Sequence, residues 1–156
     1  MLLVRLICVG KLKEEYWREA TAEYEKRLSG MCKLEIIELP QVRIGNSPSS
    51  TEIEAVLDKE ASQIVPKLVG RVYPLCIEGR KLDSLDLAKI LEDTMQSPGE
   101  MSFVIGSSHG LSDRVKQVGE RISMSKMTFP HQLARVMLLE QIYRGMQILR
   151  GSPYHK

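Results

Sequence analysis

The segment Met101-Ser-Phe-Val-Ile-Gly-Ser-Ser-His-Gly-Leu111 joins a short apolar run to a polar turn that two glycines bracket. Ser112 follows as the predicted N-cap of a helix. A second apolar–polar segment, residues 122–127, leads into an apolar helix predicted from Pro130 to about Arg150. In an open α/β sheet, ligands bind at polar loops that follow a strand and precede a helix. The sequence therefore predicts the functional site at these two loops.

The chain before this region alternates between predicted strands and predicted helices. Continuous apolar runs predict buried strands at residues 2–9, 33–39 and 71–77. Helical spacing of apolar residues predicts helices at 13–28, from a capping box at Thr51 and Glu54 to Pro66, and at 84–95. Residues 41–50 are interpreted as a loop and residues 78–81 as a turn that ends the third strand. The alternation predicts one α/β domain over residues 1–156, with a mainly parallel sheet and helices on both faces.

Composition narrows the class of protein. With 43% hydrophobic and 27% charged residues, the 156-residue chain is typical of globular proteins. A net charge of +2 permits an RNA partner without requiring one, and we expect no DNA partner. We expect neither a membrane span nor a secretory signal, because the apolar runs are too short. Cys8, Cys32 and Cys76 form no metal-binding or disulfide pattern, so a cytoplasmic location and a site without metal are expected.

The two loops favour different interpretations. The loop at residues 106–110 matches neither dinucleotide-binding nor Walker patterns, so Gly106 indicates either close backbone approach to a ligand or a tight turn. In the loop 124–129, two methionines and a phenylalanine stand among hydroxyls and a lysine. This mixture suits a flat apolar ring with polar edges, such as adenine, although Met127 and Phe129 could instead be core residues that anchor the next helix.

The terminal helix is apolar on more than one face. One face can pack on the sheet, and the excess apolar surface needs a second cover. A homodimer is the simplest arrangement that provides one.

Several motifs together resemble one protein family. These motifs are Phe103-Val-Ile-Gly106, Gly110-Leu111, Ser125-Lys-Met-Thr-Phe-Pro-His-Gln132, Arg135-Val136, Glu140-Gln-Ile-Tyr-Arg144 and Pro153-Tyr-His-Lys156, with support from residues 9–13 and 24–27. They resemble the ribosomal large-subunit methyltransferase H family, within the SPOUT superfamily, and the resemblance covers essentially the whole chain. One departure is Ser107, which stands where the family typically has a second glycine.

The resemblance implies a SPOUT-type α/β-knot fold with a C-terminal trefoil knot. It also implies a homodimer that uses S-adenosyl-L-methionine to methylate N3 of a pseudouridine in 23S rRNA, at the subunit interface of the ribosome. The implied cofactor-binding residues are Leu75, Gly106, Met124, Ser125, Lys126, Met127, Thr128 and Phe129. A competing hypothesis is a non-catalytic nucleotide- or RNA-binding module on the same fold.

For the implied reaction, an imide proton must be removed or offset. No carboxylate stands near the motif in the sequence, which leaves His131, Arg135, Tyr154 and His155. We expect Arg135 to face the developing anion or a phosphate and His131 to orient the base or accept the proton, since their i,i+4 spacing places them on one helix face. Tyr154 and His155 could close over a flipped-out base. The alternatives are that His131 only caps the loop and that Tyr154 only packs at a dimer interface.

Overall fold

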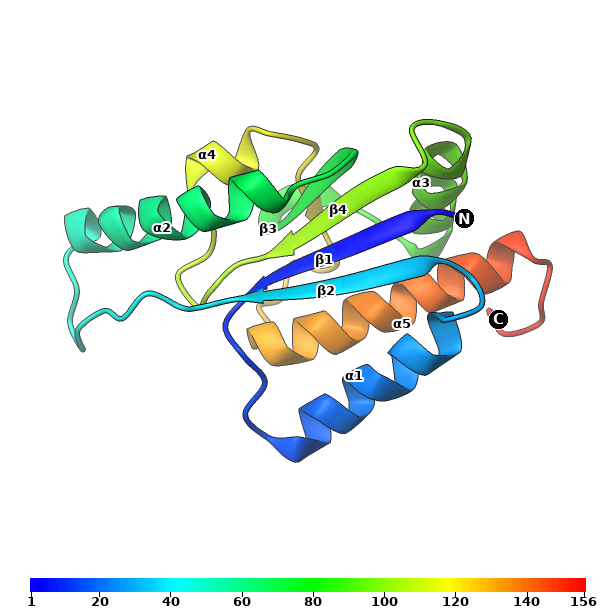
Figure 1. Cartoon of the computed structure of the whole chain (residues 1–156), viewed down its shortest axis with the longest axis horizontal. Helices are drawn as coiled ribbons and strands as arrows, with labels where there is room; N and C mark the ends of the chain where they lie inside the picture. Colours follow the sequence, from blue (N-terminus) through cyan, green and yellow to red (C-terminus); the bar gives the residue numbers. More distant parts are fainter.

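The protein is built on a five-stranded sheet in the order β2-β1-β4-β3-β5 (Figure 1). The computed structural model describes residues 1–156. All strand pairings within this sheet are parallel, which confirms the predicted α/β class and mainly parallel sheet. The strands are β1 (Leu3–Val9), β2 (Lys33–Leu39), β3 (Arg71–Lys81), β4 (Glu100–Ile105) and β5 (Ile122–Ser123).

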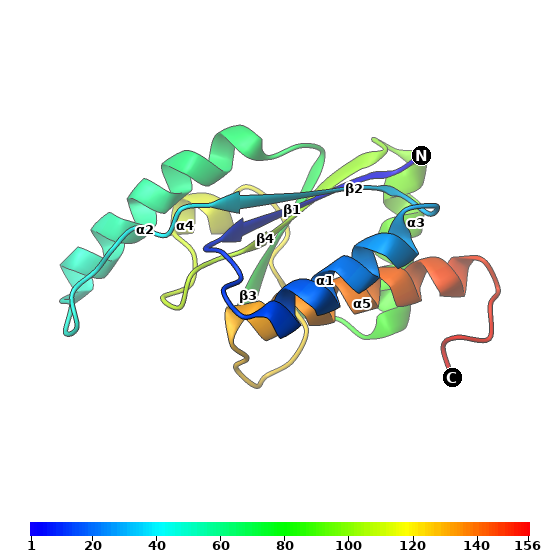
Figure 2. The same ribbon diagram turned by 60° about the horizontal axis from the view of Figure 1, so that its bottom comes forward.

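Helices cover both faces of the sheet, as Figures 1 and 2 show. One face carries α1 (Glu15–Leu28), α3 (Ser84–Gln96) and α5 (His131–Leu149), with α5 packed against both other helices. The opposite face carries α2 (Ser50–Ile64), the short 3-10 helix η1 (Val65–Lys67) and α4 (Asp113–Lys116). None of these helices is long and apolar enough to cross a membrane.

Two hydrophobic clusters hold these layers together because successive side chains of a strand point to opposite faces. On β1, Val4 and Leu6 enter the larger cluster, beneath α1, α3 and α5. Ile7 and Val9 enter the smaller cluster, against α2 and α4. The near-continuous apolar run of β1 follows from its central position, where both faces are covered.

Three local predictions were wrong in detail. The capping box of α2 is formed by Ser49 and Glu52, which exchange hydrogen bonds, and lies two residues before the predicted pair. β3 continues through the predicted turn to Lys81 because β5 pairs with it again at Arg80, after a register shift. β5 itself is limited to two residues, and the rest of the predicted segment is loop.

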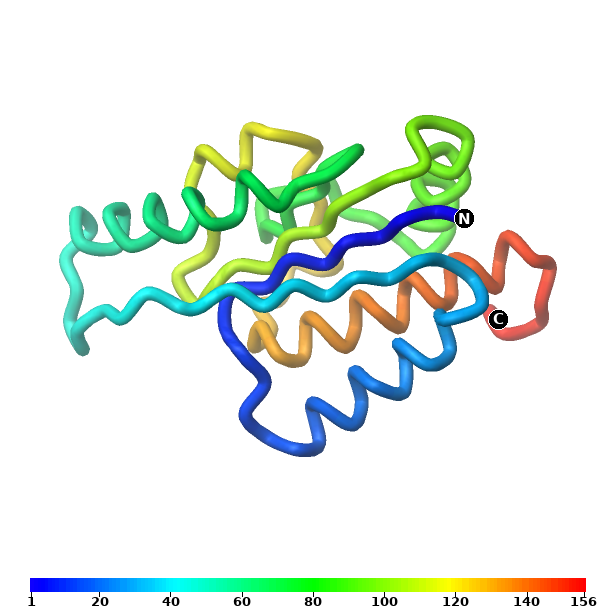
Figure 3. The backbone as a smooth tube through the Cα atoms, in the orientation of Figure 1, coloured from blue at the N-terminus to red at the C-terminus, as the bar shows by residue number.

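Figure 3 shows the path of the chain after the sheet is complete. The chain leaves β5, crosses the loop 124–130 and enters α5 near the carboxyl ends of the strands. The tail after Leu149 folds back at the far end of α5. The start of this helix therefore lies at the carboxyl edge of the sheet and its end lies beside the tail, one helix length away, which decides how the predicted site residues are distributed.

Candidate functional site

A cavity with a volume of about 820 Å³ lies among the loops at the carboxyl edge of the sheet. Residues 75–78 of β3 meet the loops after β4 and β5 there, because neighbouring parallel strands point to the same edge of the sheet. The first residues of α5 close the cavity. Seven predicted cofactor-binding residues line it: Leu75, Gly106, Met124, Ser125, Met127, Thr128 and Phe129. The structure thus brings both predicted loops together, although their binding role stays a prediction.

The loop after β4 is held closed by its own backbone. Ser107 and Gly110 form an antiparallel bridge in which Gly110 N donates to Ser107 O at 2.9 Å. A Cβ placed on Gly106 would lie 2.3 Å from the Gly110 carbonyl oxygen. Of the two interpretations of Gly106, the tight turn is therefore sufficient on its own to require glycine.

The loop before α5 is organised around Ser125. The Ser123 hydroxyl donates to Ser125 O at 2.8 Å, and Met127 N donates to Ser125 Oγ at 3.0 Å. Met127 is 72% exposed at the cavity mouth, so the expectation that it could be a core residue is wrong. Lys126 is exposed and does not line the cavity.

His131 is the only predicted catalytic residue that lines the cavity. Its ring lies beside the glycine that ends β1, since a Cβ placed on Gly10 would be 3.7 Å from His131 Cε1. Burial lowers the pKa of His131 from 6.5, and the Arg135 guanidinium lowers it further, against a smaller opposing effect of Glu14. The imidazole is therefore neutral at pH 7 and can accept a proton.

Arg135 lies one turn further along α5 but is buried beneath the site, with 1% of its surface exposed. Its Nη1 donates to Glu38 Oε2 at 2.6 Å and its Nη2 donates to Gly10 O at 3.2 Å. No carboxylate was expected from the sequence around the motif, but β2 supplies Glu38 to Arg135 from a distant part of the chain. In this arrangement Arg135 contacts the chain itself and does not face the cavity.

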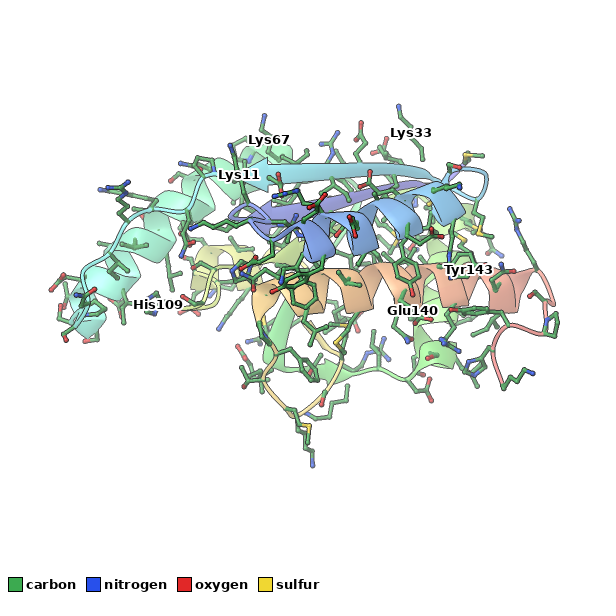
Figure 4. All side chains as sticks on the ribbon, turned by 90° about the horizontal axis from the view of Figure 1, so that it is seen from below. Lys11, Lys33, Lys67, His109, Glu140 and Tyr143 are labelled. Atoms are coloured by element: carbon green, nitrogen blue, oxygen red, sulfur yellow. The ribbon has the colours of Figure 1, made fainter.

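Tyr154 and His155 lie at the other end of α5. Tyr154 Oη donates to Glu140 Oε2 at 2.8 Å, and its ring packs edge-on against Tyr143 at 4.9 Å between centroids. His155 Nδ1 lies 3.2 Å from Arg144 Nη1. Figure 4 shows Glu140 and Tyr143 well away from His109 of the cavity loop. The 19 residues of α5 span about 28 Å, so one chain does not bring its own tail to its own cavity.

The sequence did not predict the hydrogen bond between Ser107 and Glu60 behind the cavity loop. Glu60 is 3% exposed and accepts a hydrogen bond from Ser107 Oγ at 3.0 Å. A signal was present, because Glu60 stands four residues after Val56 and four before Ile64, on the apolar face of α2. An acid on such a face indicates a buried partner.

A parallel sheet with a cavity among the loops at its carboxyl edge is the arrangement in which open α/β proteins bind ligands. Residues 2–155 match a family described as "Predicted SPOUT methyltransferase". A Methanococcus vannielii protein named "Putative ribosomal RNA large subunit methyltransferase H" is 47% identical over 98% of this chain and 99% of its own length. The chain belongs to the SPOUT methyltransferase family.

Solved structures agree with this fold. The crystal structure of a "Probable Methyltransferase" from Bordetella pertussis Tohama I superposes with a TM-score of 0.55 and 11% identity, covering 92% of this chain and 93% of that one. The crystal structure of TrmJ from Z. mobilis ZM4 gives a TM-score of 0.50 and 11% identity, covering 93% of this chain and 70% of that one. At such identities the likeness concerns the fold alone.

Proposed function

We propose that this protein methylates N3 of a pseudouridine in 23S rRNA, using S-adenosyl-L-methionine. The observation that carries the proposal is the cavity in which residues 75–78 of β3 and the loops after β4 and β5 meet His131. The near full-length similarity to a protein named as a ribosomal RNA large subunit methyltransferase supports the substrate class. The trefoil knot and the cytoplasmic location remain predictions that accompany this proposal.

The lining of the cavity fits S-adenosyl-L-methionine. Its volume of about 820 Å³ lies within the range of sites for small ligands. Leu75, Met124 and Phe129 offer apolar walls for an adenine ring, while the hydroxyls of Ser125 and Thr128 offer polar contacts at its edge. The bound cofactor supplies a methyl group already activated by its sulfonium. The chain's own task is therefore to position the acceptor base and to manage its proton.

His131 is the residue best placed for the proton. It lines the cavity, and its lowered pKa keeps the imidazole neutral at pH 7. We propose that it accepts or orients the imide proton of the acceptor base. Arg135 supports this role because it lies one turn from His131 and its charge disfavours protonation of the imidazole. Glu38 holds Arg135 in place by accepting its hydrogen bond.

A second copy of the chain would complete the site. Half-buried apolar residues continue along the outer side of α5, among them Val136, Met137 and Ile148. Since the tail of each chain lies about one helix length from its own His131, a two-fold dimer is the arrangement that can bring Tyr154 and His155 to a cavity. In that dimer each cavity would receive the tail of the partner.

The RNA substrate would be recognised mainly by shape. With a net charge of only +2, binding to free RNA should be weak and strongly dependent on salt. Sequence-specific RNA recognition favours exposed loop bases that a large particle can present. We therefore propose the assembled ribosome as the substrate, and expect faster methylation of ribosomes than of a naked hairpin.

The deciding experiment is transfer of tritium from labelled S-adenosyl-L-methionine to ribosomes that lack the modification. Mass spectrometry of nuclease digests then locates the methyl group. We expect one methyl group, on N3 of a single pseudouridine. Binding of cofactor and ribosomes without any transfer would instead support the non-catalytic binding module. Transfer to another base or to free hairpins alone would contradict the proposed substrate.

A further inference from the structure

A buried carboxylate lies directly behind the loop that forms one wall of the cavity. Glu60 belongs to α2 and is 3% exposed, yet no Lys or Arg forms an ion pair with it. An isolated buried carboxylate is costly unless hydrogen bonds satisfy its oxygens. The hydrogen bonds that satisfy the Glu60 carboxylate therefore indicate its role.

Both oxygens of Glu60 accept hydrogen bonds from loops at the carboxyl edge of the sheet. Oε1 accepts from the Ser107 hydroxyl at 3.0 Å, in the loop between β4 and α4. Oε2 accepts from Val42 N at 3.3 Å, in the loop between β2 and α2. Ser107 is itself 7% exposed, so water competes little for the first bond. One side chain thus ties two loops to α2.

The Ser107 contact fixes the part of the loop that faces the cavity. Ser107 is bridged to Gly110, and Ser108 and His109 between them line the cavity. Holding Ser107 from behind therefore limits where these two residues can lie.

We propose that Glu60 is a positioning residue for the cofactor: through Ser107 it holds the loop 106–110 in the conformation that binds S-adenosyl-L-methionine. The inference rests on the proposed function. Burial raises the pKa of Glu60, while the bonds from Ser107 and Val42 and the charge of nearby His109 act in the opposite direction. Burial thus disfavours the ionised form of Glu60, and the hydrogen bonds from Ser107 and Val42 partly offset this cost.

The test is a double-mutant cycle on cofactor affinity, measured by calorimetry with purified full-length protein. Ser107→Ala should weaken the binding of S-adenosyl-L-methionine about tenfold, which corresponds to the loss of one charge-assisted hydrogen bond. Glu60→Ala should give a similar loss, and the double variant should lose no more than either single variant. Glu60→Gln keeps an acceptor for Ser107 and should retain affinity within about threefold. Glu54→Gln, an exposed acid on the same helix, is the matched control and should bind like wild type.

Turnover separates positioning from a merely structural role. A displaced loop raises KM for the cofactor and leaves kcat at saturating cofactor within about twofold. A loss of folded protein would instead lower kcat and leave KM unchanged. If Glu60→Ala does not fold, Ser107→Ala and Glu60→Gln still decide the question.

Wild-type affinity and KM in a folded Ser107→Ala variant would overturn the inference while leaving the proposed function intact. Strictly additive losses in the cycle would also overturn it. Failure of the wild-type protein to bind the cofactor would remove the proposed function, and the inference with it.

Discussion

Arg135 of α5 and Glu38 of β2 form an ion pair, with Arg135 Nη1 2.6 Å from Glu38 Oε2. The guanidinium side chain is 2% exposed and the carboxylate side chain 34% exposed. Arg135 also donates to the carbonyl of Gly10, whereas its Nε has no partner. The pair links α5 to β2 and to the end of β1, and so fixes the first turns of the helix that carries His131.

Removing the carboxylate should destabilise the protein because it leaves a buried guanidinium unpaired. We expect Glu38→Ala to lower the free energy of unfolding by about 2–3 kcal/mol, somewhat below the loss for fully buried pairs, since Glu38 is partly exposed. Urea unfolding measures the change. Glu120→Ala breaks the exposed pair with Arg80 and serves as control, with an expected loss of about 0–1 kcal/mol. Equal losses in the two variants would contradict a buried role for Arg135.

A side chain at Gly106 should open the loop after β4. The Cβ of Gly106→Ala would lie 2.3 Å from the Gly110 carbonyl oxygen, so the turn must shift. We expect a stability loss of about 1–3 kcal/mol, typical of overpacking, together with weaker cofactor binding. Gly45→Ala is the control, because a Cβ there meets nothing within 4 Å. Thermal unfolding and calorimetry report the two effects, and an unchanged melting temperature in Gly106→Ala would count against the turn geometry.

The decline of the reaction rate at low pH should follow the protonation of His131. Its pKa lies below 6.5, so the single-turnover rate should not fall until the pH drops below that value. His131→Ala should reduce the rate and abolish its decline at low pH. A variant that keeps the wild-type rate and the same decline would exclude His131 as the base. Arg135→Met should raise the pKa of His131 and move the decline to higher pH, as NMR titration of the imidazole can verify.

The lowered pKa of His131 also makes the stability of the protein depend on pH. The unfolded chain binds the proton on His131 more readily than the folded chain. The histidine's contribution to stability is therefore lost as the pH falls from about 6.5 through the lowered folded-state value. Urea unfolding across this range should show the loss in wild type and a smaller slope in His131→Ala.

Mixing two inactive variants tests whether the site is shared between subunits. His131→Ala damages the cavity and Tyr154→Ala damages the tail. Random reassortment of equal amounts should restore about one quarter of wild-type activity, because half of the two-fold dimers are mixed and each has one intact site. Sites contained within one chain would show no recovery. Sedimentation showing a fully active monomer would contradict the dimer as well.

Much of the fold could be predicted from local patterns. Apolar runs placed four of the strands to within a few residues, and helical spacing did the same for α1, α3 and α5. The two site loops were also predicted, because loops that follow parallel strands meet at one edge of the sheet. The extension of β3 could not be predicted, since Glu78-Gly79-Arg80-Lys81 has turn composition and becomes strand only beside β5.

The supports of the site were less predictable because their partners are distant in sequence. Glu38 precedes Arg135 by 97 positions, and Glu60 precedes Ser107 by 47. No periodicity encodes such pairs. A polar residue on an apolar face shows only that a partner is needed, and the sheet order decides which residue supplies it.

The position of β5 at the sheet edge has a consequence for the order in which the protein becomes competent. β5, the loop 124–130 and the start of α5 provide one side of the cavity, and they belong to the last quarter of the chain. During synthesis from the N-terminus, the first four strands can pair before any of these residues leaves the ribosome. A nascent chain of that length has its central sheet but only part of its cavity, so the cofactor can stabilise the protein only after β5, the loop 124–130 and the start of α5 have been synthesised.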